Sequence, residues 1–320
     1  MYYDAGVCWV RLVFVRRGCM RILTIGSTLL LTALASPSVA SAYCRSTTCT
    51  GEDCTRDEDG CKTSGAKLYW PTSCVGISLQ EDSSVHIDFK YFEQAAQRSL
   101  FSWTGLECGD GLATIGFSQL EEVACKKTEY NSGGTNANVI LFQDTKWIYK
   151  GVDNTLAKTT VTFNDETGEI LDADIEINHA NNLFTINDMT VEYDLESVLT
   201  HELGHLIGID HTPDFDATMF AGYEPGSIDQ RTLEEDDILA ACEAYPASRK
   251  ATCAPDPRGG LGIECGGVDN PADDQGVGGC TNCSVQHREE PPLHWGLLPL
   301  GALLLGTRRA SRQRSTRKRG

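Results

Sequence analysis

The chain has 320 residues, of which 41% are hydrophobic, and this fraction is high enough for a buried core. Its formal net charge is -18 at pH 7, and because both ends of the sequence are basic, the acidic residues are concentrated between them. An acidic body of this kind argues against nucleic acid and anionic membrane surfaces as partners. The carboxylates could also bind calcium, although a solvated acidic surface explains them equally well.

The first 42 residues are typical of an export signal. Arg16, Arg17 and Arg21 precede an apolar run from Ile22 to Ala35, and small residues that fit a cleavage site follow. The run is shorter than a membrane-spanning helix needs, so residues 1–42 are interpreted as a signal peptide. We therefore expect an exported protein.

Fourteen cysteines are present, and twelve of them follow the predicted cleavage site. An even number is typical of disulfides in an exported protein. Their pairing does not follow from the sequence, although Cys108 and Cys125 flank one predicted strand and could close a local loop. Residues 43–66 are rich in Cys, Asp and Thr, which predicts a disulfide-stapled extension and not part of the core.

The next part of the chain predicts strands with one helix among them. Residues 68–79 contain several β-forming residues, and residues 88–103 place apolar side chains three and four positions apart, as in an amphipathic helix. Turn-forming residues 164–168 predict a hairpin. Further strands are expected at 112–117, 138–143, 159–163 and 170–178.

Two more helices are expected after these strands. Asp194 can cap a helix that ends near Gly208. A capping box over residues 232–235 would open a last helix that continues to about Ala244. This order of elements predicts an α+β domain over residues 67–247.

The composition changes after this domain. Residues 248–290 are rich in Gly, Pro, Asp and Cys, which predicts a linker, and they include the pair Cys280 and Cys283. Residues 291–320 combine about a dozen apolar residues with a cluster of arginines. An apolar stretch of this length is marginal for crossing a bilayer of ~30 Å. This segment resembles the C-terminal sorting tails of myxobacterial surface proteins. A short hydrophobic tail without that role is the alternative.

Residues 201–211, HELGHLIGIDH, carry the most informative pattern in the chain. His201 and His205 are four apart and would share one face of a helix. Gly208 can end that helix and let His211 return as a third ligand. Three imidazole ligands with the fourth position open are typical of a catalytic zinc site.

Glu202 adjoins the first histidine and could reach a zinc-bound water without binding the metal itself. Zinc lowers the pKa of such a water to about 7. Glu202 would take its proton during attack on a peptide carbonyl and later return it to the leaving amine. These residues predict an endopeptidase that acts on proteins or peptides. A surface cluster of histidines and a purely structural zinc site are the alternatives, and Glu202 speaks against the latter.

The motif resembles the signature of the metzincin clan, and its surroundings resemble the matrixin-type zinc metallopeptidases. Met219 follows His211 by eight residues and is similar to the methionine that forms a hydrophobic floor under the zinc. Thr212 is closest to the matrixin serine, and Tyr223 matches a tyrosine that borders the primed-side specificity pocket. The resemblance implies an α+β, metzincin-like domain with a mixed, mostly parallel twisted sheet of about five strands, an active-site helix and a C-terminal helix.

The same resemblance extends upstream. Residues 156–163 correspond to the edge strand on which a substrate adds as an antiparallel strand. Asp174 stands where animal matrixins place a structural-zinc histidine, so one catalytic zinc is predicted. Asp172, Asp174 and Glu176 could bind calcium, or they could be exposed strand carboxylates.

The remaining histidines are isolated in the sequence and are interpreted as ordinary surface residues. They are His86, His179, His287 and His294. Three hypotheses result from the whole sequence. The first is a secreted zinc endopeptidase, either extracellular or anchored at the cell surface through its C-terminal tail. The second is a metzincin with a narrow role, such as cutting one cell-surface or cell-wall-linked target. The third is a surface-anchored zinc-binding module with little or no turnover.

Overall fold

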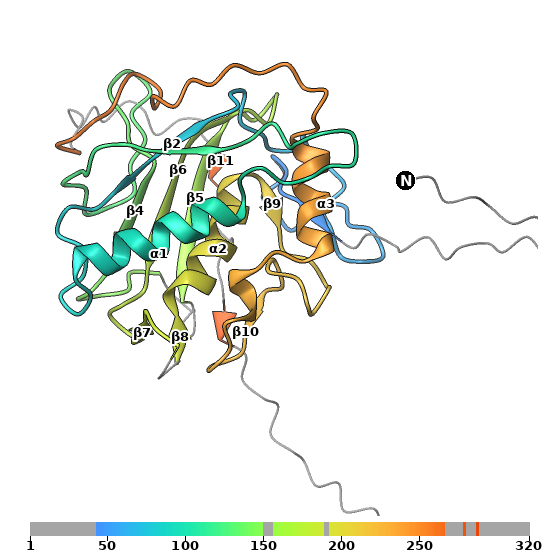
Figure 1. Ribbon diagram of the computed structural model, residues 1–320. Coiled ribbons are helices and arrows are strands. Elements are labelled where there is room, and N and C mark those ends of the chain that lie inside the picture. Colours follow the sequence, from blue (N-terminus) through green and yellow to red (C-terminus); the bar gives the residue numbers. More distant parts are fainter. Residues whose placement is uncertain (1–42, 150–155, 189–191, 266–277, 280–285, 288–320) are drawn as a thin grey trace, which may run out of the picture. The chain divides into compact units, whose positions relative to one another are not determined.

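The computed structural model describes residues 43–149, 156–188, 192–265, 278–279 and 286–287 (Figure 1). The predicted signal peptide, the sorting tail and the Cys280–Cys283 pair lie outside the described residues. Within the described residues, no helix has the length and apolar character needed to cross a membrane.

A mixed sheet with the order β11-β5-β6-β4-β2-β3 forms the centre of the domain. Its strands are β2 (Val75–Leu79), β3 (Phe117–Gln119), β4 (Val139–Phe142), β5 (Ala157–Phe163), β6 (Ile170–Ile177) and β11 (Gly278–Gly279). Strands β3, β2, β4 and β6 are parallel, whereas β5 is antiparallel to β6. The predicted α+β domain with a mixed, mostly parallel sheet of five strands is confirmed. The two-residue β11 extends it along β5.

Three helices accompany the sheet: α1 (Phe89–Ser102), α2 (Leu195–Leu206) and α3 (Glu235–Ala244). Figure 1 shows α1 and α2 in front of the central strands, and the two helices contact each other directly. The indole of Trp103 donates to the carbonyl of Thr200 at 2.8 Å. The hydroxyl of Ser99 donates to the carbonyl of Glu196 at 3.0 Å. These bonds fix α2 in the core.

Short elements complete the domain. They are β1 (Cys44–Arg45) paired with β9 (Ile209–Asp210), β7 (Phe184–Thr185) with β8 (Tyr193–Asp194), β10 (Gly222–Tyr223) with β12 (Gln286–His287), and the 3-10 turn η1 (Asp229–Arg231).

Several predicted element boundaries are confirmed and others are wrong. Asp194 caps α2 as expected, since its carboxylate accepts from the Ser197 amide at 3.1 Å. The strand expected at 68–79 begins only at Val75, because Pro71 in its first half has no amide hydrogen for a sheet. The strand expected at 112–117 is wrong in its bounds, because β3 begins only at Phe117 and ends at Gln119.

The capping box of α3 also differs from the prediction. It is formed by Glu234 and Asp237, two residues beyond the predicted box. The Asp237 carboxylate also accepts from the amides of Thr218 and Met219, so a tertiary contact fixes where this helix begins.

Five disulfides link the described residues. They are Cys44–Cys61, Cys49–Cys54, Cys74–Cys253, Cys108–Cys242 and Cys125–Cys265. The prediction of a local Cys108–Cys125 bridge is therefore wrong. Packing brings Cys242 of α3 next to Cys108 and brings Cys265 next to Cys125. Contacts between such distant parts of the chain cannot be deduced from the positions of the cysteines in the sequence. Two of the bridges also tie residues 253–265 to the sheet region.

One face of β6 carries a row of buried carboxylates. Asp172, Asp174 and Glu176 are each only 1–2% exposed, so their interpretation as exposed strand residues is wrong. Asp174 accepts from the amides of Val139 and Glu129, and burial raises its pKa to about 8. Burial and the neighbouring Asp174 raise the pKa of Asp172 well above its ordinary value. Among the described residues, no hydrogen-bond donor reaches Asp172 Oδ1.

The substitution Asp172→Asn tests this burial. A carboxyl whose pKa is raised by folding favours the folded state when protonated, so its contribution is complete below pH ~4 and is lost as the pH rises. Asparagine carries no charge to bury. We expect the free energy of unfolding to rise at pH 8 and to change little at pH 4, because burial raises the pKa of the Asp172 carboxyl. Urea denaturation at both pH values measures this. Destabilisation at pH 8 would contradict it.

Candidate metal centre

Three histidine side chains meet beside the C-terminal half of α2. His201 and His205 lie one helical turn apart, and His211 follows β9. Their Nε2 atoms are 3.1 Å apart in all three pairs. His201 and His205 are completely buried, whereas His211 is partly exposed. The site therefore has one side that opens outward.

The hydrogen bonds of two rings fix which nitrogen carries the proton. Nδ1 of His201 donates to the carbonyl of Thr218 at 2.7 Å, and Nδ1 of His205 donates to the carbonyl of Ile209 at 2.9 Å. Their Nε2 atoms therefore present lone pairs to the centre. Burial, followed by the neighbouring imidazoles, lowers the pKa of His201 well below its ordinary value. Burial lowers the pKa of His211 to about 3.

This donor set fits a zinc ion. Neutral imidazole nitrogen is a preferred zinc ligand at about 2.0–2.1 Å, and a tetrahedral ion with such bonds holds its ligand atoms about 3.3 Å apart. The Nε2 atoms of His201 and His205 carry no hydrogen, because the protons of these rings are engaged at Nδ1, so their two lone pairs face each other at 3.1 Å and repel. A cation at the centre resolves this repulsion.

The turn after α2 brings the third histidine to the other two. The helix ends at Leu206, and Gly208 has a φ of 84°, which side chains rarely tolerate. A Cβ at Gly208 would also lie 2.6 Å from the carbonyl oxygen of Leu68. The carbonyl of Gly208 accepts from Arg45 Nε at 3.0 Å. The helix break expected at Gly208 is thus present, and it is packed too closely for any larger residue.

Glu202 follows the first histidine and is completely buried. Its Oε2 accepts from the hydroxyl of Thr159, on β5, at 2.5 Å. Thr159 is also completely buried. Thr159 could not be recognised from the sequence, because nothing in a strand pattern distinguishes one inward-facing threonine from another.

Met219 is 1% exposed and packs against α2 between the two helical histidines. A Cβ added to Gly204 would lie 2.2 Å from the Met219 sulfur and 2.9 Å from Trp103, so the helix needs glycine at this point. The amides of Thr218 and Met219 both donate to Asp237 at the start of α3, at 2.8 and 3.0 Å. Helix α3 therefore holds the loop whose Thr218 carbonyl accepts the hydrogen bond from His201.

Tyr223 is buried at the wall of a cavity of about 700 Å³. Its hydroxyl accepts from the Asp194 amide at 2.8 Å and donates to the Ser227 carbonyl at 2.6 Å. Burial raises the pKa of this phenol. Apolar side chains that line the same cavity include Phe215, Phe220 and Ile228. Tyr223 thus connects the start of α2 with the loop that surrounds the cavity.

Residues 133–246 match the family model for Matrixin. The chain carries a matrixin domain. The matched region contains all of α2 and α3, the three histidines and Met219. No curated protein matches the chain significantly. A matrixin domain supports a zinc-dependent metalloprotease in general, and the histidine cluster is a group that could hold the metal.

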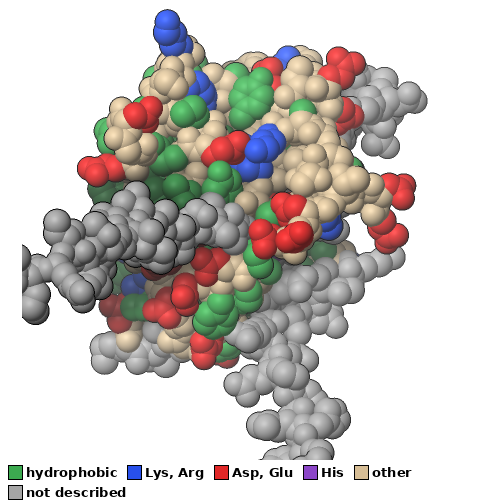
Figure 2. All heavy atoms as spheres, turned by 90° about the vertical axis from the view of Figure 1, so that its right-hand side faces the viewer, with side chains coloured by type: hydrophobic (Ala, Val, Ile, Leu, Met, Phe, Trp, Pro, Cys, Tyr) green, Lys and Arg blue, Asp and Glu red, His purple; other side chains and the backbone are tan. Residues whose placement is uncertain are grey.

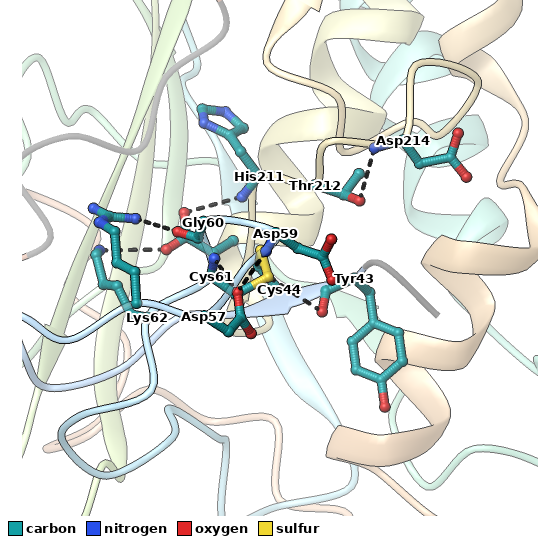
Figure 3. Close-up of a disulfide and its surroundings, with 12 residues drawn as sticks. Tyr43, Cys44, Asp57, Asp59, Gly60, Cys61, Lys62, His211, Thr212 and Asp214 are labelled. Carbon is teal, nitrogen blue, oxygen red and sulfur yellow. Dashed lines mark hydrogen bonds and ion pairs between the residues drawn. A yellow bond between two sulfur atoms is a disulfide. The ribbon is translucent and has the colours of Figure 1, made fainter. Parts of the chain in front are cut away.

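The N-terminal extension contacts the matrixin domain next to the third histidine (Figure 3). Strand β1 pairs with β9, so that Cys44 lies opposite Asp210. The Asp210 carboxylate accepts from the His211 amide at 2.9 Å, and its other oxygen lies 3.3 Å from Lys62 Nζ. The Cys44–Cys61 bridge connects β1 to the segment that carries Lys62. The sequence predicted the stapling of this extension but not its position.

His179 corrects another expectation. It is 5% exposed, and its Nδ1 lies 2.9 Å from Asp144 Oδ1 and 2.5 Å from the Ser84 hydroxyl. The ring of His86 stacks edge-on against it, with 5.1 Å between centroids. The interpretation of His179 as an isolated surface residue is therefore wrong.

The carboxylates of β6 do not form a comparable metal cluster. Among the described residues, His201, His205 and His211 are the one group of three ligating side chains whose ligand atoms lie within 4.8 Å of one another. The matrixin domain thus presents one site with the geometry of a metal centre in its described part.

Removal of the Asp210 carboxylate should weaken metal binding, because it fixes the backbone of a histidine ligand. Contacts of this kind typically change metal affinity by about 10–100-fold. We expect Asp210→Ala to raise the Kd for zinc at least about tenfold, measured by competition with a chromogenic chelator. Asp216→Ala removes an exposed carboxylate from the same loop and should leave the Kd unchanged. Equal zinc affinity in the two variants would contradict the role of Asp210.

Proposed function

We propose that this protein is a secreted zinc endopeptidase in which His201, His205 and His211 hold the metal and Glu202 is the general base. The observation that carries the proposal is the convergence of three imidazole nitrogens beside a buried carboxylate one residue from the first histidine. This is the donor set of a catalytic zinc site, in which protein ligands leave one position open.

A bound zinc ion would supply Lewis-acid chemistry, polarising a peptide carbonyl and acidifying water. Glu202 would accept the proton of the attacking water and deliver it to the leaving nitrogen. Its burial on the inner side of α2 keeps bulk water from competing for that proton. Met219 packs against α2 at Gly204, next to His205, and Tyr223 fixes the loop around the neighbouring cavity.

Strand β5 supports an extended peptide as the substrate. The two-residue β11 pairs antiparallel with Thr162 and Phe163 on the side of β5 opposite β6, so this side of β5 can take an added antiparallel strand. Addition of a peptide strand to such an edge supplies backbone hydrogen bonds without sequence preference. The cavity beside Tyr223 could receive one substrate side chain and so provide selectivity.

The surface and the disulfides support an extracellular location. Five disulfides among the described residues require an oxidising compartment for their formation. On the face shown in Figure 2, acidic side chains are more widespread than basic ones. This distribution favours protein or peptide substrates over nucleic acid. Anchoring through residues 291–320 remains part of the proposal.

Cleavage of denatured casein or gelatin by the purified exported chain tests the proposal. We expect cleavage that a zinc chelator abolishes and that Glu202→Ala reduces at least about 100-fold, since a positioned acid–base group contributes on the order of 10²–10⁴. The zinc content of this variant should equal that of wild type. Glu166→Ala, in the exposed turn between β5 and β6, is the matched control and should keep full activity.

Two outcomes would count against the proposal. Stoichiometric zinc without cleavage of any protein or peptide library would favour a zinc-binding module. Cleavage that survives in Glu202→Ala would show that this carboxylate is not the base.

A further inference from the structure

The hydroxyl of Thr159 contacts the carboxylate of the proposed base, Glu202. Thr159 Oγ1 lies 2.5 Å from Glu202 Oε2 and 3.1 Å from the backbone carbonyl oxygen of the same residue. Both side chains are completely buried. The two residues are 43 positions apart in the sequence, so this contact forms only when α2 packs on β5.

The distances indicate which acceptor holds the proton. A threonine hydroxyl has one hydrogen and can donate to only one acceptor at a time. Bonds from a hydroxyl to an ionised carboxylate are typically about 2.5–2.7 Å long, shorter than bonds between neutral groups. The shorter contact therefore assigns the hydrogen to the Glu202 carboxylate, and the carbonyl at 3.1 Å is a second acceptor within reach.

The backbone holds Thr159 firmly in this place. Its Cα pairs with Ile175 in the middle of the β5–β6 ladder, which is regular from Ala157 to Thr162. A β-branched side chain also has few rotamers in a strand. The hydroxyl is thus presented by a rigid element, whereas the longer glutamate side chain has three side-chain torsions that must be fixed from outside.

We propose that Thr159 is a positioning residue for Glu202. Its hydroxyl holds Oε2 while Glu202 is ionised, so that Oε1 is the oxygen that exchanges the proton with the reacting water. The inference rests on the proposed function, because it assigns Thr159 a part in the same proton transfer.

Three variants of the exported chain test how the Thr159 hydroxyl affects kcat and KM. Thr159→Val keeps the shape and removes the hydroxyl, Thr159→Ser keeps the hydroxyl, and Thr200→Val is the control. Thr200 is equally buried, but its hydroxyl donates to the Glu196 carbonyl of its own helix. We expect Thr159→Val to lower kcat at least about tenfold, the usual scale for a hydrogen bond to a charged group, with KM unchanged within about twofold.

Thr159→Ser should keep kcat within about threefold of wild type, and Thr200→Val within about twofold. Zinc content should be the same in all four proteins. An unchanged kcat in Thr159→Val would overturn the proposal. An equal loss in Thr159→Val and Thr159→Ser would also overturn it, because packing of the methyl group would then be the cause.

A double-mutant cycle tests the contact without any catalysis. Thr159→Val, Glu202→Gln and the double variant are compared with wild type by urea denaturation of the zinc-loaded protein. Coupled residues give midpoint shifts that do not add, whereas independent residues give additive shifts. Additive shifts would overturn the contact. If wild type cleaves no peptide, the proposed function fails, and the cycle still decides whether Thr159 holds Glu202.

Discussion

Three imidazole nitrogens are held 3.1 Å apart in a buried place, and much of the domain serves to keep them there. Without a cation the lone pairs of His201 and His205 face each other and repel, because both rings carry their proton at Nδ1. Two backbone carbonyls, from Thr218 and Ile209, fix the rings of the helical histidines. Metal binding would remove this local repulsion. It should therefore stabilise the folded state.

Helix α2 is the element through which most of these constraints act. Its N-terminus is capped by Asp194, whose amide also donates to the Tyr223 hydroxyl near the cavity. Its middle contacts α1 through Trp103 and contacts β5 through Thr159. Its end is closed by Gly208, over which the N-terminal extension lies. The metal ligands, the base and the wall of the cavity therefore all depend on the placement of this one helix.

Much of this arrangement could be predicted from the sequence. The spacing of His201, Glu202 and His205 follows from helical geometry, and a glycine after the helix indicates the turn that precedes His211. Strands β4, β5 and β6 lie close to the predicted β-forming runs, whereas the mixed, mostly parallel sheet was implied by the family resemblance. These features depend on local sequence, where the relation between residue type and backbone is direct.

Other parts depend on contacts between distant segments and could not be predicted. The hydroxyl of Thr159 reaches Glu202 only because two elements pack together. The Asp210 carboxylate forms an ion pair with Lys62, which belongs to an N-terminal extension without a recognisable strand pattern. The carboxylates of β6 alternate as an exposed strand would, yet loops from elsewhere in the chain cover them. Cysteine pairing has the same cause, because α3 and residues 253–265 return to the sheet from far along the chain.

The central claim is that three histidines hold a zinc ion and leave one position open. X-ray absorption at the zinc edge of the purified exported chain tests it most directly. The account predicts three imidazole nitrogens and one oxygen at about 2.0–2.1 Å. In His211→Ala the number of imidazole ligands should fall. A sulfur ligand at about 2.3 Å, or three imidazoles that persist in His211→Ala, would contradict the account.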